Sequence, residues 1–371
     1  MTFLKNLKIN DKLIKDLDFT LIITIILIVI FGILNIYSTT YKQSGIKTAK
    51  IQSIWLILGL VVMYFILTID YKVLSNYVKA FYWTWIVIIT CNDFLGRAVK
   101  GAKAMVQLGE RTFAPAEFVK LALIFMLAKK IDEMEEGVNN PKNLLILAVY
   151  SIIPIVLILA QPALGMAIVS FALTVGILYI SKIRLKIFGW GILAIVIFTF
   201  IAWSANIIPA YQRNRVMGLL NPDSGTQGIN MQVTYSKIAI GSGGLLGKGY
   251  LKGSMNTSVP EHQTDFIFCT VGEEWGLAGS AFLLLLYGIV IWRIIYIAKN
   301  SKDQFGCLIC VGIVSAFLFS ILQNIGMTIG FMPVSGIALP FMSYGGSSML
   351  TYFMGMGFVL NVGMRRRLIN F

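Results

Sequence analysis

Long apolar runs separated by short polar segments make up most of this chain. An α-helix rises 1.5 Å per residue, so about 20 apolar residues are enough to span the hydrocarbon layer of a membrane. Ten windows of about this length occur, at residues 19–38, 51–69, 77–93, 115–131, 144–161, 164–181, 187–207, 266–297, 305–326 and 347–363. The pattern predicts an all-α polytopic membrane protein, a bundle of about ten transmembrane helices.

The polar segments between these windows are short, with one exception. Residues 208–264 form the longest connection, and we expect a large extracellular loop there. No linker-like stretch divides the chain, so a single integral membrane domain over residues 1–371 is expected. The first window follows a polar stretch with four lysines and no small-residue cleavage site, which indicates an uncleaved helix rather than a signal peptide.

Composition supports the membrane class, and charge gives an orientation. Of the 371 residues, 57% are hydrophobic and 13% are charged, and the mean hydropathy is +0.79, which is typical of polytopic membrane proteins. With a cytoplasmic N-terminus, the inside segments hold 18 Lys and Arg residues and the outside segments hold 12. The positive-inside rule therefore predicts that both termini are cytoplasmic and that the large loop faces outward.

Basic residues also occur in the two longest outside segments, where the positive-inside rule does not explain them. They are Lys100, Lys103, Arg111, Arg213, Arg215, Lys237, Lys248 and Lys252. They are either solvated loop charges or a collar for an anionic substrate at the outer surface. No interleaving of aromatic and basic residues accompanies them, so nucleic acid is not an expected partner.

Several common kinds of site are not supported. His262 is the only histidine, which leaves little for a His-based metal site or a Ser-His-Asp triad. Cys307 and Cys310 form an isolated C-x-x-C in an apolar run and are interpreted as packing residues. The glycine run from Gly241 to Gly249 lacks the Ser or Thr of a phosphate loop and the third glycine of the dinucleotide fingerprint, so neither ATP nor NAD is expected.

The segment Pro260-Glu-His-Gln-Thr-Asp-Phe-Ile-Phe268 places a carboxylate, Asp265, where an apolar span begins. Thr264 and Asp265 precede a predicted helix and could act as its cap. The apolar core of this span begins only near Gly276, so an unbroken helix would put Asp265 roughly 16 Å further toward the outside. Glu273 and Glu274 lie between them. A cap does not explain these two acids, whereas a polar vestibule between helices explains all three.

Glu117 and Lys120 form a second charged group, in the first turns of the fourth window. They follow Pro115, which suits the first turn of a helix. Their i, i+3 spacing places both side chains on one face, where they can pair. Such a pair is either purely structural or part of a substrate site, because ionisable residues within a membrane usually face the bundle interior or a wet cavity.

A series of motifs follows one order from about residue 95 to the end of the chain. It comprises Val99-Lys-Gly-Ala102, Ala114-Pro-Ala-Glu-Phe-Val-Lys120, Gln161-Pro-Ala-Leu-Gly165, Ser236-Lys-Ile-Ala-Ile-Gly-Ser-Gly-Gly244, Pro260–Phe268, Gly272-Glu-Glu-Trp-Gly276, Pro333-Val-Ser-Gly-Ile-Ala-Leu-Pro340 and Ser343-Tyr-Gly-Gly-Ser-Ser348. In these motifs and in its ten spans the chain resembles the SEDS family (shape, elongation, division and sporulation). The run that begins at Ser236 favours the elongation branch of that family over the division branch.

The resemblance implies an inverting peptidoglycan glycosyltransferase that polymerises lipid II into β-1,4 glycan strands at the outer face of the bacterial cytoplasmic membrane, for cell elongation and shape. Asp265 matches the family's essential aspartate and is the expected general base. Glu117 and Lys120 match its acid–lysine pair, and Lys120, Arg213 and Arg215 are expected to stabilise the departing diphosphate. The residues expected to bind substrate are Glu117, Lys120, Arg213, Arg215, Lys237, His262, Glu273, Glu274 and Ser343.

The partners implied by the resemblance are lipid II, membrane lipid and a class B penicillin-binding protein. No cofactor is certain, and a divalent-cation requirement is left open. The alternative functions are a lipid II flippase of the same fold, which needs no base at Asp265, and the division or sporulation member of the family. A secondary transporter predicts broken helices in two matching halves, and the sequence contains no such repeat. Ala163 departs from the family, which commonly has an aspartate there.

Overall fold

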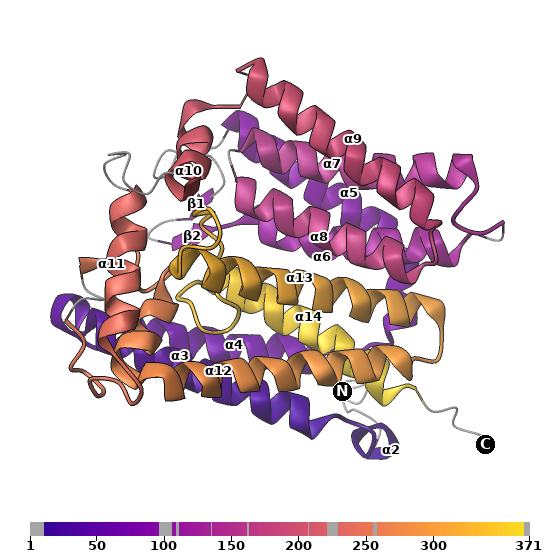
Figure 1. Cartoon of the computed structure of the whole chain (residues 1–371). Coiled ribbons are helices and arrows are strands. Elements are labelled where there is room, and N and C mark those ends of the chain that lie inside the picture. Colours follow the sequence, from indigo (N-terminus) through magenta and orange to yellow (C-terminus); the bar gives the residue numbers. More distant parts are fainter. Residues whose placement is uncertain are drawn as a thin grey trace.

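The computed structural model describes residues 11–95, 106–108, 111–134, 136–161, 163–206, 208–220, 229–254 and 258–366. A helix overlaps each of the ten predicted windows. In chain order these helices are α3 (Phe19–Ser44), α4 (Lys47–Thr68), α5 (Tyr71–Leu95), α6 (Pro115–Asp132), α7 (Pro141–Ala160), α8 (Leu164–Ile180), α9 (Leu185–Ser204), α12 (Ile267–Lys299), α13 (Gln304–Thr328) and α14 (Gly346–Met364). A short helix, α2 (Asp11–Ile14), precedes them. The predicted helical bundle is confirmed (Figure 1).

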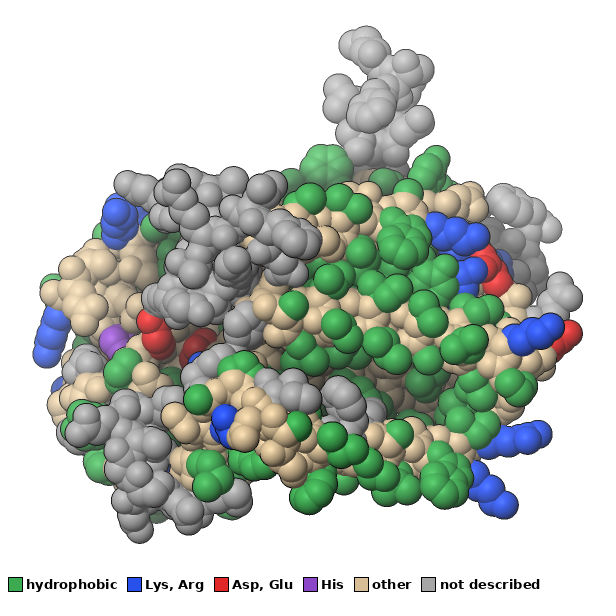
Figure 2. All heavy atoms as spheres, turned by 90° about the horizontal axis from the view of Figure 1, so that it is seen from above, with side chains coloured by type: hydrophobic (Ala, Val, Ile, Leu, Met, Phe, Trp, Pro, Cys, Tyr) green, Lys and Arg blue, Asp and Glu red, His purple; other side chains and the backbone are tan. Residues whose placement is uncertain are grey.

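The surface of the bundle has the distribution of side chains expected of a membrane protein. Hydrophobic side chains cover the middle of the face in Figure 2, and charged side chains gather toward its two ends. By length and composition alone, six helices of the described chain are suited to cross a membrane: α3, α4, α7, α9, α12 and α13. Helix α8 is apolar but shorter, and α6 carries charged residues at both ends.

Helix α6 lies in the interior of the bundle. Every residue from Pro115 to Ala128 is buried, because α5, α7, α8, α13 and α14 all pack against this helix. Burying a charged group without a partner costs several kcal/mol. The ionisable groups of α6 therefore need partners within the protein.

Two of the connections between the predicted spans contain regular elements. The large loop contains α10 (Ala210–Leu220) and α11 (Ile229–Ser242). Before α6, β1 (Val106–Leu108) and β2 (Arg111–Phe113) form an antiparallel pair, with Gln107 opposite Thr112. Neither α10 nor α11 contains an apolar run of membrane-spanning length, so hydropathy windows do not detect these two helices. These elements lie at one end of the bundle, and α2 and the C-terminal end of α14 lie toward the other (Figure 1).

Helix α12 is broken at Gly276, where φ is 63° and ψ is −157°. The glycine loop, which we define as residues 243–254, pairs with the helix backbone at this break. The backbone N–H groups of Lys248 and Gly249 donate to the carbonyls of Glu273 and Glu274, and those of Leu277 and Ala278 donate to Gly244 and Leu245, each at 3.0 Å. The unbroken helix assumed for the 16 Å estimate is therefore not observed.

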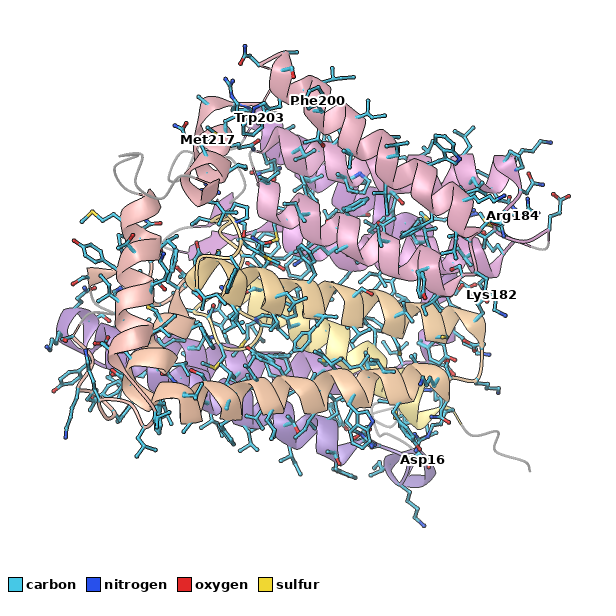
Figure 3. All side chains as sticks on the ribbon, viewed as in Figure 1. Asp16, Lys182, Arg184, Phe200, Trp203 and Met217 are labelled. Atoms are coloured by element: carbon cyan, nitrogen blue, oxygen red, sulfur yellow. The ribbon has the colours of Figure 1, made fainter. Side chains whose placement is uncertain are left out.

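Helix α9 is the least enclosed of the predicted spans. Only 6% of its apolar window is buried in the protein, and Phe200 is 70% exposed. Figure 3 shows Phe200 and Trp203 at the edge of the bundle, near Met217 of α10. A helix this apolar and this exposed is expected to face lipid or another transmembrane segment.

Candidate functional site

Asp265 lies in a turn that precedes α12, at the end of the bundle where α10 and α11 are found. The N-cap residue of α12 is Phe266, which makes no side-chain capping hydrogen bond. The Thr264 hydroxyl donates instead to the carbonyl and the carboxylate of Glu261, at 3.1 and 3.0 Å. The N-cap residue of this helix is therefore neither Thr264 nor Asp265.

Three consecutive carbonyls of this turn are held by neighbouring elements. The Asn324 side-chain amide of α13 donates to the Asp265 carbonyl at 2.7 Å, and the Ser343 hydroxyl donates to the Thr264 carbonyl at 2.5 Å. The Tyr344 N–H donates to the Gln263 carbonyl at 2.9 Å. Each bond joins residues distant in sequence, so the backbone that carries Asp265 is fixed by α13 and by the segment between α13 and α14.

The same segment approaches the Asp265 carboxylate. A Cβ atom built on Gly336 would lie 3.5 Å from Asp265 Oδ2, and Gly336 has a φ of 70°. Gly165, at the start of α8, also lies against this segment. A Cβ atom on Gly165 would be 2.6 Å from the Ser335 carbonyl oxygen. The start of α8, next to Ala163, thus packs against the segment that contacts Asp265.

Glu117 and Lys120 pair as their spacing predicts. Lys120 Nζ lies 2.7 Å from Glu117 Oε2, and each side chain is only 4% exposed. Lys120 Nζ also lies 5.6 Å from the centre of the Tyr352 ring of α14, a cation–π distance. The pair is an enclosed ion pair inside the bundle.

Glu273 and Glu274 are bound by residues of the glycine loop and of α3. Glu273 is fully buried and lies 2.6 Å from Lys248 Nζ, and its carboxylate accepts from the Ser254 N–H at 3.0 Å. Glu274 accepts from the Ser38 hydroxyl of α3 at 2.5 Å. These contacts hold the glycine loop and α3 against α12 near its break. A shared vestibule with Asp265 stays a prediction.

Burial of Tyr250 in the glycine loop raises the pKa of its phenol, and the nearby Glu274 and Tyr37 raise it further. The phenol is therefore protonated at neutral pH, and it donates to the Leu34 carbonyl of α3 at 3.2 Å. This contact adds to those that hold the glycine loop on the bundle.

The predicted basic residues separate into two groups. Arg215 of α10 and Lys237 of α11 line one pocket together with Thr234, Gly330 and Val334. Arg213, two residues before Arg215, donates instead to the Asn206 side chain. Two of the eight predicted collar residues therefore meet at a single pocket.

His262 is buried in the same turn as Asp265. Its Nδ1 lies 2.8 Å from the Val259 carbonyl, which can only accept, so Nδ1 carries the proton in that contact. Lys100, Lys103 and the Val99–Ala102 motif lie outside the described residues. No group of three or more His, Cys, Asp or Glu residues suited to a metal occurs within the described part of the chain.

Asn324 is the residue of this site that sequence reasoning missed. It is fully buried in α13, and besides Asp265 it donates to the Ile337 carbonyl at 2.7 Å. The available signal was the polar pair Gln323-Asn324 within an otherwise apolar span. A buried amide of this kind needs partners, and here they are the two segments that form the site.

Comparison with known proteins assigns the family. Residues 17–368 match the FtsW/RodA/SpoVE family, described as cell cycle proteins. The peptidoglycan glycosyltransferase MrdB of Escherichia coli is 33% identical over 366 residues, which cover 97% of this chain and 98% of MrdB. Stage V sporulation protein E of Bacillus subtilis is 30% identical over 372 residues, covering 94% of this chain and 98% of that protein.

Solved structures agree with this assignment. RodA of Thermus thermophilus has a TM-score of 0.72 and 26% identity, covering 95% of this chain and 98% of RodA. A chain of a peptidoglycan synthase complex, described as structurally coordinating polymerization and crosslinking, has a TM-score of 0.83 and 26% identity. The match covers 94% of this chain and 98% of that chain. This chain belongs to the FtsW/RodA/SpoVE family, the SEDS proteins, and is a multi-pass protein of the bacterial inner membrane.

Proposed function

We propose that this protein is a peptidoglycan glycosyltransferase that polymerises lipid II for cell elongation, as a single SEDS-type membrane domain over residues 1–371. Its relative MrdB carries that enzyme name and aligns over 97% of this chain. The observation that carries the proposal is the Asp265 turn, whose backbone carbonyls accept from Asn324, Ser343 and Tyr344. A carboxylate fixed in this way is preorganised for proton transfer.

The proposed reaction is an inverting displacement. The sugar 4-hydroxyl of the acceptor attacks the anomeric carbon of the donor, which is linked to a lipid diphosphate. The bond from that carbon to the diphosphate oxygen breaks. The bonding electrons leave with the diphosphate, and the hydroxyl proton passes to Asp265, the general base. Fixed cations stabilise the diphosphate as its charge grows.

The other proposed substrate contacts follow from their positions. Glu117 and Lys120 lie at the start of α6, and Arg213, Arg215 and Lys237 lie on the two helices of the large loop. We propose that His262, in the same turn as Asp265, and Ser343, which donates to the Thr264 carbonyl, act beside Asp265. Glu273 and Glu274 are proposed to support the substrate region through the glycine loop, to which Glu273 is bound.

We further propose that both termini are cytoplasmic and that the Asp265 turn faces outward. The partner would be a class B penicillin-binding protein, in keeping with the similar chain of a peptidoglycan synthase complex that coordinates polymerization with crosslinking. Coupling the two activities requires both active sites on the same side of the membrane, which is the side of the glycan product.

The test is polymerisation of labelled lipid II by purified protein with its partner. Asp265→Asn keeps the size of the side chain but cannot take a proton at neutral pH, so we expect product to fall about 100- to 10,000-fold with lipid II binding retained. Glu261→Gln, in the same turn, is the matched control, since its amide oxygen can still accept from Thr264. Undiminished polymerisation by Asp265→Asn would rule out the general-base role.

A further inference from the structure

Gln52 is a polar residue of the apolar helix α4, and only 1% of its surface is exposed. Its side-chain amide donates to the Ser343 carbonyl at 3.1 Å, and its amide oxygen accepts from the Gly345 N–H at 3.4 Å. A buried amide in a membrane span needs partners of this kind. Both partners belong to the segment between α13 and α14, which also binds the Asp265 turn.

The first of these bonds is made to a peptide unit that itself holds the Asp265 turn. The Ser343 carbonyl and the Tyr344 N–H belong to one planar peptide, so the orientation of one group sets that of the other. Gln52 donates to this carbonyl, and the N–H donates to the Gln263 carbonyl at 2.9 Å. A chain of hydrogen bonds therefore runs from α4, through one peptide, to the residue two positions before Asp265. Hydrogen bonds in such a chain strengthen one another.

Ser343 reaches the same turn through its side chain. Its hydroxyl donates to the Thr264 carbonyl at 2.5 Å and accepts from the Leu339 N–H at 2.7 Å. The Thr264 carbonyl and the Asp265 nitrogen are again parts of one peptide. Gln52 therefore holds the backbone of the residue whose hydroxyl binds next to Asp265, and a shift of Ser343 would move the Asp265 backbone.

The packing of α4 against α14 leaves Gln52 little freedom to move. Trp55 lies one turn further along the same face of α4, and a Cβ atom on Gly346 would lie 2.3 Å from the Trp55 ring. One turn beyond Trp55, a Cβ atom on Gly59 would lie 2.2 Å from the Phe353 ring. The two helices meet without spare space, which fixes the register of Gln52 against the segment before α14.

The same segment also reaches the start of α6. The Ser347 hydroxyl accepts from the Ala114 N–H at 3.1 Å. Ala114 is the N-cap residue of α6 and lies three residues before Glu117. One short segment thus contacts both the Asp265 turn and the helix that carries Glu117, and α4 holds that segment from the other side.

We propose that Gln52 is a positioning residue, which sets the place of Asp265 through the peptide between Ser343 and Tyr344. This role rests on the proposed glycosyltransferase function. A general base must lie within hydrogen-bond reach of the proton that it takes, and a misplacement of about 1 Å can lower the rate about 100-fold. Helix α4 precedes the series of motifs that begins near residue 95, and none of the expected site residues lies on it.

The first test separates kcat from KM in the polymerisation of labelled lipid II. Gln52→Met keeps the length of the side chain and removes both hydrogen bonds. We expect kcat to fall about 10- to 100-fold and KM to stay within about twofold, because the base is displaced while the substrate contacts are kept. Gln52→Asn guards against misfolding, because it keeps an amide in the span, and its shorter stem should give a smaller loss of kcat.

Asn361→Leu is the matched control. Asn361 is a fully buried amide of α14 that donates to the Ile66 and Ile69 carbonyls, at the opposite end of α4 from Gln52. The substitution removes the same kind of contact between the same two helices, far from the Asp265 turn. The unfolding midpoint should fall, and kcat should stay within about twofold of wild type.

Hydrogen–deuterium exchange tests the link without turnover. Leu339 and Tyr344 donate N–H groups to this network. In Gln52→Met both amides should exchange about tenfold faster or more, whereas in Asn361→Leu they should stay within about twofold of wild type.

Wild-type exchange in Gln52→Met would overturn the link between α4 and the turn. Faster exchange with wild-type kcat would show that Gln52 serves packing alone and would overturn the positioning role. Faster exchange in a protein that makes no glycan would uphold the link and refute the proposed function.

Discussion

Asp265 and Glu117 are both carboxylates near the same end of the bundle, but their environments differ. Glu117 is enclosed and lies 2.7 Å from an ammonium group. Asp265 is only partly buried, and the backbone carbonyls of its turn accept from Asn324 and Ser343. The first arrangement is an enclosed ion pair, and the second is the setting of the carboxylate that we propose as the general base.

This difference can be tested on the Glu117–Lys120 pair. Glu117→Gln leaves a buried ammonium group without its counter-charge and should lower the free energy of unfolding by about 3–5 kcal/mol. The double variant Glu117→Leu with Lys120→Met removes both charges and should recover most of that loss. The measurement is thermal and denaturant unfolding of the purified protein in detergent.

Lipid II polymerisation by the double variant then separates a structural role from a substrate role. If the pair binds substrate, the double variant should remain inactive even though its stability is recovered. A double variant that is both stable and fully active would show that the pair serves folding alone.

Some residue contacts could be predicted from the sequence, and others could not. The Glu117–Lys120 pair follows from i, i+3 spacing on one helix, which is local information. The ion pair of Glu273 with Lys248 joins a helix to a loop residue 25 positions away, and Asn324 reaches Asp265 across 59 positions. Such contacts depend on how the elements pack, and a single sequence does not contain that arrangement.

At the scale of elements, the break in α12 depends on glycines. Gly247 has a φ of 81°, and a Cβ there would lie 2.1 Å from the Glu274 carbonyl oxygen. Gly241, near the end of α11, has nothing within 4 Å of the corresponding position. Two glycines in the same run therefore occupy opposite environments.

We expect Gly247→Ala to destabilise the protein by more than about 1 kcal/mol and to expose the glycine loop to protease, because the side chain fits neither the backbone angle nor the space. Gly241→Ala should be neutral or stabilise by up to about 1 kcal/mol, since it lies in a helix with open space around it. Unfolding midpoints and limited proteolysis of the two variants provide the comparison. Equal behaviour would contradict the role assigned to Gly247.

Element prediction succeeded where one property dominates. A helix overlaps each of the ten windows because a long apolar run is a local signal that a hydropathy window detects. Helices α10 and α11 were not predicted from hydropathy, because they carry polar residues such as Arg213 and Lys237 and pack at one end of the bundle. Strands β1 and β2 pair over only three residues each, which is too short for an alternation of apolar and polar residues to predict a strand.

At the scale of the whole molecule, charge marks two ends and apolar surface separates them (Figure 2). Figure 3 shows Asp16, Lys182 and Arg184 toward the end that is remote from α10. The glycine loop, with Lys252, pairs with the other end of α12. The proposed orientation requires these two sets of residues to face opposite sides of the membrane.

Cysteine labelling tests that orientation directly. In a background with the four native cysteines replaced, Lys252→Cys should react with a membrane-impermeant maleimide on intact spheroplasts. Arg184→Cys, also exposed, should react only after permeabilisation, because the proposed orientation places it on the cytoplasmic side. The reverse pattern would invert the proposed topology and place the Asp265 turn inside the cell.

The backbone pairing of the glycine loop with α12 also bears on how this protein can diverge. The four hydrogen bonds use only N–H and C=O groups, so they do not depend on which side chains the loop carries. Leu245 and Leu246 are 72% and 83% exposed, so other side chains at these positions should leave the pairing intact. Gly247 and Gly276, in contrast, approach so closely that a Cβ on Gly276 would lie 2.4 Å from the Gly247 nitrogen. Related chains should therefore preserve the spacing of these glycines, and insertions should accumulate on either side of the loop but not within it.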